Sequence, residues 1–306
     1  MKQALNRRDF IKLAGLGGVI FASGLSGCAT NGASKLGNKT EDDFYFVQLS
    51  DSHWGFEGAA NPDAKNTLKK AVAAVNSLAQ QPDFIIFTGD LTHTTDDPIE
   101  RRKRLAEFKQ IVSELKVKNV HFMPGEHDAA LDRGKAYQEF FGETHYSFDH
   151  KGVHFITLDN VSDPTASIGN EQLAWLAADL NKQADDAKIV VFAHRPLFDL
   201  YPQWDWATRD GAKAVDLLLA HKNVTVFYGH IHQENHHLTG HIPHHSAKSL
   251  IFPLPAPGSQ PKRAPVPWDA TQPYKGLGFR EVDTELQKNQ YEINELTVQG
   301  LPVAKA

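Results

Sequence analysis

Apolar residues along the chain fall into two repeating patterns, short continuous runs and longer stretches with helical spacing. Residues 83–87 form a nearly continuous apolar run, which is typical of a parallel strand buried on both faces. Residues 63–80 instead carry Leu68, Val72 and Val75 at the spacing of one helix face. The alternation of the two patterns indicates an α/β fold. We predict strands over residues 44–49, 83–87, 120–123, 189–192 and 224–228, and helices over residues 63–80, 99–115, 170–183 and 207–220.

Three further segments complete the expected fold. Residues 146–156 alternate around a Lys-Gly turn and predict a β-hairpin. Residues 253–267 are rich in proline and predict an irregular segment, whereas residues 276–298 alternate weakly and predict closing strands. We therefore expect one α/β domain over residues 44–306, with two facing, mixed sheets and helices outside them.

Polar side chains recur where the predicted strands end. In chain order these residues are Asp51, His53, Asp90, Glu126, His127, Asp128, His194, His230 and His232. Ligand sites of α/β sheets lie at the carboxyl ends of the strands. Carboxylates and imidazoles are ligands that zinc, manganese and iron accept. The pattern therefore predicts a hydrolase with two metal ions.

The balance of charge excludes one class of partner. The chain has 32 Lys and Arg residues against 37 Asp and Glu residues, so no basic excess points to a nucleic-acid-binding patch. Cys28 is the only cysteine, so the chain cannot form an internal disulfide. Residues 28–43 are polar and predict a tether ahead of the domain.

Residues 1–27 are predicted to be an export signal rather than part of the fold. Arg7 and Arg8 lie in a twin-arginine segment, and residues 13–25 are apolar but short for a membrane span. The Leu-Ser-Gly-Cys sequence that follows resembles a bacterial lipoprotein processing site, with Cys28 as the lipidated residue. An ordinary cleaved signal with an incidental cysteine is the alternative. Both interpretations place the protein on the periplasmic side of the envelope, and the first anchors it to a membrane.

Five motifs resemble, in this order, those of the calcineurin-like metallophosphoesterase superfamily, which includes cyclic-nucleotide phosphodiesterase-like enzymes and purple acid phosphatases. They are Asp51-x-His53, Gly89-Asp90, Gly125-Glu126-His127-Asp128, His194 and Gly229-His230-x-His232. The resemblance covers roughly residues 44–240. It implies a four-layer α/β/β/α sandwich and an enzyme that hydrolyses phosphate mono- or diesters. A phosphoester is accordingly the expected small-molecule partner.

The resemblance also implies a role for each motif residue. A hydroxide that bridges two metal ions would attack phosphorus. His127 would donate a proton to the leaving oxygen, and Asp128 would fix the orientation of His127. The implied ligands are Asp51, His53 and His232 for one metal ion, Glu126, His194 and His230 for the other, and Asp90 as the bridge between them.

Glu126 departs from the family pattern, which usually has asparagine at this position. Glutamate keeps a ligand oxygen, adds a negative charge and loses an N–H donor. A trivalent ion would restore the charge, so we expect two metal ions, iron together with manganese, zinc or a second iron. The added charge would also repel an anionic substrate. The alternative function is therefore a metal-binding envelope accessory protein with a degenerate, weakly active site.

Other residues near the motifs allow two interpretations each. His93 could contact substrate or lie at the rim, and Arg195 could meet phosphate. The aromatic residues within 201–206 could stack on a substrate ring, although packing within their own loop is favoured. The histidines within 236–245 are expected on a hairpin surface rather than at a third metal site. The basic run 101–104 is expected on the solvated face of its helix.

Overall fold

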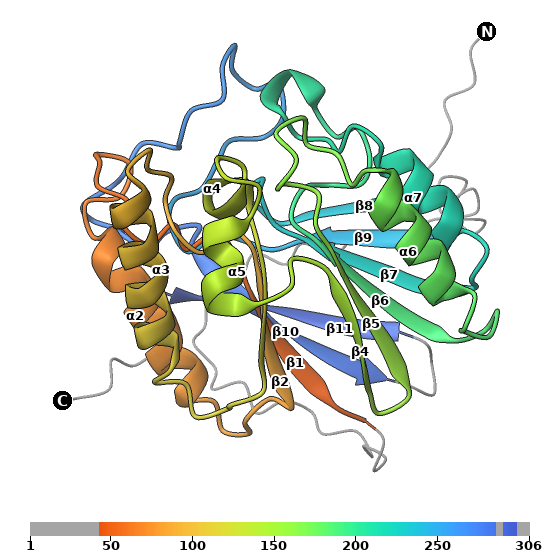
Figure 1. Cartoon of the computed structure of the whole chain (residues 1–306). Coiled ribbons are helices and arrows are strands. Elements are labelled where there is room, and N and C mark those ends of the chain that lie inside the picture. Colours follow the sequence, from red (N-terminus) through yellow and green to blue (C-terminus); the bar gives the residue numbers. More distant parts are fainter. Residues whose placement is uncertain (1–42, 286–289, 299–306) are drawn as a thin grey trace, which may run out of the picture. The chain divides into compact units, whose positions relative to one another are not determined.

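Two β-sheets form the centre of the fold (Figure 1). The computed structural model describes residues 43–285 and 290–298, so the predicted export signal (residues 1–27) and nearly all of the tether (residues 28–43) lie outside it. The first sheet has the order β11 (Gln290–Thr297), β10 (Gly278–Glu285), β1 (Tyr45–Leu49), β2 (Phe84–Thr88) and β3 (Val120–Met123). The second has the order β4 (Tyr146–His150), β5 (Val153–Leu158), β6 (Lys188–Ala193), β7 (Asn223–Tyr228), β9 (Ile242–Ser246) and β8 (Asn235–Thr239).

Both sheets are mixed, as predicted. Strands β1, β2 and β3 pair in parallel, and so do β5, β6, β7 and β9. Strands β10, β11, β4 and β8 add antiparallel edges. Parallel neighbours require long crossovers. Helices supply most of them, whereas β7 and β9 are joined through strand β8. The helices are α2 (Ala64–Asn76), α3 (Pro98–Val112), α4 (Glu126–Ala129), α5 (Lys135–Phe141), α6 (Asn170–Leu180) and α7 (Gly211–Leu218), with a short 3₁₀ turn η1 (Pro202–Trp204).

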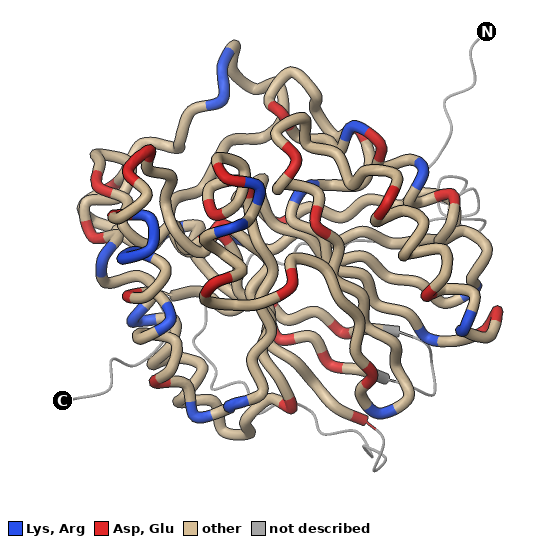
Figure 2. The backbone as a smooth tube through the Cα atoms, in the orientation of Figure 1, with Lys and Arg blue, Asp and Glu red and all other residues tan. Residues whose placement is uncertain are grey.

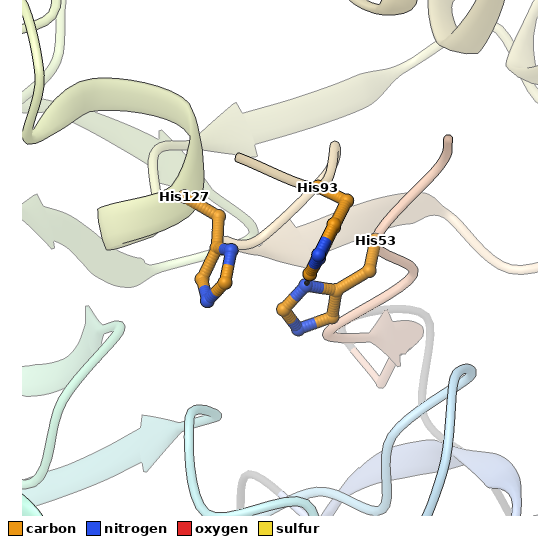
Figure 3. Close-up of side chains that lie close together, drawn as sticks. All are labelled: His53, His93 and His127. Carbon is orange, nitrogen blue, oxygen red and sulfur yellow. Dashed lines mark hydrogen bonds between the residues drawn. The ribbon is translucent and has the colours of Figure 1, made fainter. Parts of the chain in front are cut away.

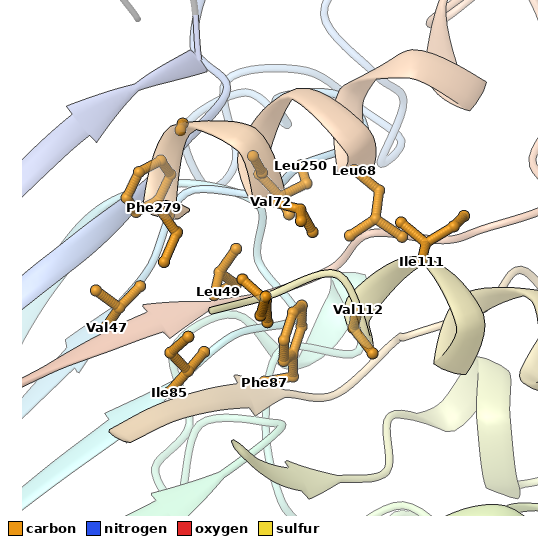
Figure 4. Packing of buried hydrophobic residues seen from close by; sticks show 14 of the residues in the cluster. Val47, Leu49, Leu68, Val72, Ile85, Phe87, Ile111, Val112, Leu250 and Phe279 are labelled. Atoms are coloured by element: carbon orange, nitrogen blue, oxygen red, sulfur yellow. The ribbon is translucent and has the colours of Figure 1, made fainter. Parts of the chain in front are cut away.

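Three apolar clusters hold the layers together. Helices α2 and α3 pack on the outer face of the first sheet, where Leu68 and Val72 meet Val47 and Phe87 (Figure 4). Helices α6 and α7 pack in the same way on the second sheet. Between the sheets lies a cluster rich in phenylalanine, in which the rings of Phe46 and Phe84 stack with centroids 4.9 Å apart. The four-layer α/β/β/α arrangement is therefore confirmed.

One expectation for α3 was wrong. Arg101 was predicted on the solvated face, yet its side chain is 8 % exposed and its Nη1 lies 2.8 Å from Asp132 Oδ2. A second donor, Nη2, reaches the carbonyl oxygen of Thr95 at 3.1 Å. Other charged residues of α3 do pair along the helix surface, as Lys103 Nζ does with Glu100 Oε2 at 3.1 Å. Figure 2 shows both basic and acidic positions in this part of the molecule. The charge pattern of the sequence could not show that an ion pair with a distant residue turns Arg101 inward.

Among the described residues, no helix combines the length and the apolar character needed to cross a membrane.

Candidate metal centre

The ends of the parallel strands form a set of strained turns. Asp51, His53, Asp90, His230 and His232 all have positive φ, between 42° and 66°. Such left-handed conformations cost a non-glycine residue about 1–3 kcal/mol and persist where the surrounding structure enforces them. Backbone hydrogen bonds between the turns do so here, since His53 N–H donates to Asp90 O at 2.9 Å. Strained backbone at converging strand ends indicates a functional site.

All seven predicted ligands meet at this edge of the sheets. They form two groups whose candidate ligand atoms lie within 4.8 Å of one another. The groups share Asp90, which is the residue predicted as the bridge. The first group is Asp51, His53, Asp90 and His232, and the second is Asp90, Glu126, His194 and His230.

Backbone carbonyls fix the tautomers of three of these histidines. The Nδ1 atom of His194 lies 2.7 Å from Thr88 O, and the Nδ1 atom of His232 lies 2.9 Å from Phe252 O. The Nε2 atom of His230 lies 2.9 Å from Asp205 O. A carbonyl oxygen only accepts, so each of these nitrogens carries the hydrogen. In the neutral ring the opposite nitrogen is left with a lone pair, the arrangement that orients histidine ligands in metal sites.

The lone pairs of the second group face each other in a way that suits a cation. His194 Nε2 lies 2.9 Å from Glu126 Oε2, and His230 Nδ1 lies 2.9 Å from Glu126 Oε1. Glu126 Oε2, His194 Nε2 and His230 Nδ1 are buried and have no hydrogen-bond partner among the described residues. Two lone pairs at this distance repel unless a proton or a metal ion lies between them. The donors therefore fit a metal ion, and their nitrogen and oxygen types suit zinc, manganese or iron.

The electrostatics of the buried groups agree with this assignment. Burial raises the pKa of Glu126, but His230 and His194 hold it well below its ordinary value. Burial lowers the pKa of His194, but the carboxylates of Asp90 and Glu126 raise it well above its ordinary value. The low pKa of Glu126 keeps its carboxylate ionised at neutral pH, and this charge attracts positive charge to the site, either a proton on His194 or a metal ion in its place.

Removing bound metal is expected to lower the melting temperature by about 10 °C. Asp51, Asp90 and Glu126 lie in the two ligand groups, and without cations their charges repel one another. The measurement is calorimetry before and after chelation, with metal content followed by elemental analysis. Adding Mn(II) back is the control and should restore the original transition. An unchanged transition in protein shown to be metal-free would contradict the prediction.

His127 lies beside the first ligand group, but its hydrogen-bond partner differs from the one expected. The backbone N–H of Thr94 donates to His127 Nδ1 at 3.2 Å, and Thr94 Oγ1 lies 2.7 Å from the same atom. Because Nδ1 accepts, the hydrogen of the neutral ring is on Nε2. The His127 ring lies 4.5 Å from that of His53 and stacks on His93 at 5.1 Å (Figure 3). His127 is therefore set to donate from Nε2 next to the metal centre.

The role predicted for Asp128 in orienting His127 was wrong. Its carboxylate accepts hydrogen bonds from Leu91 N–H at 2.9 Å, Thr92 N–H at 2.8 Å and Gly125 N–H at 2.9 Å. The hydroxyl of Thr92 adds a fourth at 2.9 Å. Asp128 thus joins the turn after β2 to the turn after β3. Sequence reasoning missed Thr94, whose contact with His127 has no signal in the spacing of motifs.

Replacing Asp128 by asparagine is expected to reduce the free energy of unfolding by about 2–4 kcal/mol. The side chain is 1 % exposed, and an amide would direct an NH₂ group at N–H donors that now meet an oxygen. Chemical denaturation measures the loss. Replacing Asp149, a carboxylate 78 % exposed, by asparagine is the control and should change stability by less than about 1 kcal/mol. Equal stabilities of the two variants would contradict the bracing role of Asp128.

Two of the remaining candidates, His93 and Arg195, lie beside candidate ligands. His93 lies at the site, with its Nδ1 3.4 Å from His53 Nδ1. Trp204 and Trp206 are buried in an apolar cluster, as the packing interpretation predicted. His236 and His245 pair on the β8–β9 hairpin with Nδ1 atoms 2.7 Å apart, and neither belongs to a group of three potential ligands in the described part of the chain. Arg195 is buried beside Glu126.

Comparison with known proteins decides which family has this site. The model of the family described as calcineurin-like phosphoesterase matches residues 44–234. The chain belongs to that family. This confirms the resemblance inferred from the order of the motifs. The family is dinuclear and metal-dependent, and the structure contains two groups of residues that could bind metal ions.

Several relatives of the family are similar in sequence. A protein named probable glycerophosphodiester phosphodiesterase GpdQ, from Arcobacter nitrofigilis, is 31 % identical over 49 % of this chain and 56 % of its own length. The chain thus spans little more than half of that relative. A probable cyclic nucleotide phosphodiesterase from Rhodococcus erythropolis is 28 % identical over 68 % of this chain and 71 % of its own. The mouse serine/threonine-protein phosphatase CPPED1 is 28 % identical over 62 % of this chain and 70 % of its own length.

Solved structures of the same fold include two phosphatases. A dimetal phosphatase from Danio rerio superposes with a TM-score of 0.54 at 14 % identity, covering 84 % of this chain and 98 % of that one. A purple acid phosphatase from yellow lupin superposes with a TM-score of 0.57 at 15 % identity, covering 85 % of this chain and 52 % of that one. At this level of identity the likeness supports the fold of two mixed sheets flanked by helices.

Proposed function

We propose that the protein is a dinuclear metal-dependent hydrolase of phosphate mono- or diesters. The observation that carries the proposal is the pair of ligand groups that share Asp90. Glu126 Oε2, His194 Nε2 and His230 Nδ1, which are buried and have no hydrogen-bond partner in the described part of the chain, support it. Relatives named as phosphodiesterases and phosphatases point to the same chemistry.

The chain's own residues would divide the work of hydrolysis. Asp51, His53 and His232 would hold one cation, the second group would hold the other, and Asp90 would join them. When bound, two such cations neutralise charge on the phosphoryl oxygens and make water a better nucleophile. His127 would act in its protonated form: Nε2 would give its proton to the leaving oxygen, and the ring would return to the neutral form. The Nδ1–H of that ring would then donate to the Thr94 hydroxyl, which lies 2.7 Å away.

The metal identities are a finer proposal. Nitrogen and carboxylate ligands suit iron, manganese and zinc, and a charge count of the ligands alone favours one Fe(III) because Glu126 adds a negative charge. We therefore propose iron together with manganese, zinc or a second iron. Elemental analysis of protein purified from its native host tests this, and divalent ions alone would reject it.

Export and anchoring are proposed from sequence. Residues 1–27 would direct export by the twin-arginine route, and lipidation of Cys28 would anchor the domain on the periplasmic side. Replacing Arg7 and Arg8 by lysine should leave the protein in the cytoplasm. Replacing Cys28 by serine should release it from the membrane fraction. An ordinary cleaved signal predicts release of the wild-type protein as well.

The central experiment is a screen of phosphate mono- and diesters, beginning with bis-p-nitrophenyl phosphate. Wild type and Glu126→Asn are each loaded with Mn(II) or with iron, and metal content is measured in parallel. Turnover by either form supports the hydrolase. Two bound metal ions without turnover of any ester would reject it and favour the alternative, a metal-binding accessory protein of the envelope. The added charge of Glu126 is the observation that keeps this alternative open.

A further inference from the structure

Glu126 has a cationic neighbour that the motif pattern does not include. Arg195 follows the ligand His194 directly, and its Nη2 lies 3.7 Å from Glu126 Oε1. The side chain of Arg195 is 7 % exposed and that of Glu126 is 16 % exposed. A pair of opposite charges at this distance and depth is weakly screened by solvent. The guanidinium therefore acts on the same carboxylate that binds in the second metal group.

The surrounding structure holds Arg195 in this position. Its Nη1 donates to Asp205 Oδ2 at 2.7 Å and to Asp205 O at 3.1 Å. The backbone of Arg195 is fixed as well, because the side chain of Asn160 donates to its carbonyl oxygen at 2.9 Å. The carbonyl of Asp205 also accepts from Nε2 of the ligand His230. One loop residue thus fixes both the guanidinium and a metal ligand, so Arg195 is built into the site.

Arg195 changes the charge count of the metal centre. Asp51, Asp90 and Glu126 contribute three negative charges, and Arg195 returns one positive charge. The sum is minus two, the same as for a site with asparagine at position 126 and a neutral residue at position 195. The side chain of Asp205 is 60 % exposed, so solvent screens its charge. With Arg195 included, the charge count accepts two divalent ions as well as the mixed iron site proposed above.

We propose that Arg195 is a positioning residue that neutralises the charge added by Glu126. The pair keeps the site able to accept two divalent cations together with an anionic ester. This inference rests on the proposed function, since it concerns the same site. One competing role is direct binding of phosphate, because Arg195 Nε is buried and has no hydrogen-bond partner among the described residues.

The test compares Arg195→Met, Glu126→Asn and the double variant with wild type. Two binding constants are measured without turnover: Mn(II) affinity by competition with a chromophoric chelator, and inorganic phosphate affinity of the Mn(II)-loaded protein by calorimetry. Arg195→Met is expected to tighten Mn(II) and to weaken phosphate, each by about tenfold. Glu126→Asn is expected to have the opposite effects. The double variant should return to within about threefold of wild type in both.

Two controls separate charge from structure. Arg195→Lys keeps the positive charge and should stay within about threefold of wild type. Arg101→Met removes another buried arginine, which pairs with Asp132, and should lower the melting temperature without changing either affinity. Melting curves of all variants establish that each is folded.

Each outcome has a definite meaning. If the double variant keeps the phosphate defect of Arg195→Met, Arg195 binds phosphate directly and the compensation is rejected. If Arg195→Met leaves both affinities unchanged, the charge of Arg195 has no role at the site. If no protein in the series binds Mn(II), iron or zinc, the proposed function itself is rejected. Opposite effects that cancel in the double variant support the proposal.

Discussion

Replacing Asp90 by asparagine is expected to lower kcat/KM for phosphate esters by about 1,000-fold and to reduce bound metal from two ions toward one. Asp90 is the residue that both ligand groups share. Its Oδ2 lies 3.4 Å from His53 Nε2 and 3.4 Å from His194 Nε2, while its Oδ1 accepts from His127 N–H at 2.9 Å. Asparagine offers only one oxygen, and that oxygen is uncharged. It therefore cannot bind two metal ions and also accept the hydrogen bond from the His127 N–H of α4.

The measurements are kcat/KM with a phosphate diester and metal content by elemental analysis of the same samples. Asp179→Asn is a matched control, because Asp179 is also a buried carboxylate but pairs with His154 in the second sheet. That variant should lose stability and keep both metal ions. An Asp90→Asn protein that holds two metals and turns over normally would disprove the bridging assignment.

Replacing His127 by alanine is expected to lower kcat for alkyl phosphate esters by about 10²–10⁴-fold while both metal ions remain bound. An alkoxide needs a proton as it leaves, and a protonated His127 can supply it from Nε2 while its Nδ1–H donates to the Thr94 hydroxyl. A p-nitrophenolate leaves without protonation, so its ester should be affected much less. The unequal loss for the two leaving groups distinguishes proton donation from a general loss of structure.

The measurement is kcat for a matched alkyl and p-nitrophenyl ester pair in wild type and His127→Ala. Thr94→Val is a useful companion, because it removes the hydroxyl 2.7 Å from Nδ1 but keeps the backbone donor. Its effect should have the same leaving-group dependence and be smaller. Equal losses for both esters in His127→Ala would show that His127 is not the general acid.

The meeting of the candidate metal ligands could be predicted from sequence because it depends on topology. Parallel strands bring their carboxyl ends to one edge, so residues that follow each apolar run must meet there. Asp51 and His230 are 179 positions apart in sequence, yet Asp51 Oδ1 accepts from His230 N–H at 3.1 Å. The layered architecture could also be predicted from the apolar residues, because segments with helical spacing alternate along the chain with segments typical of buried strands.

Partners that come from different loops could not be predicted in this way. Asp128 follows His127 in sequence but braces the turn after β2, and Thr94 supplies the contact expected of it. Arg195 meets Asp205 because the loop turns sharply there, with φ of 65° at Asp205. Such contacts depend on the packing of each loop, which residue spacing does not encode.

The backbone carbonyls behind the histidine ligands limit how this site can change. Thr88, Asp205 and Phe252 each hold an imidazole through a main-chain oxygen. A point mutation replaces a side chain but leaves that oxygen in place, so the orientation of these ligands is robust to most single substitutions. Variation in metal preference or substrate must then come from the ligands, from Arg195, or from insertions that move a loop. Single substitutions are therefore expected to change the charge of the site more readily than the orientation of its imidazoles.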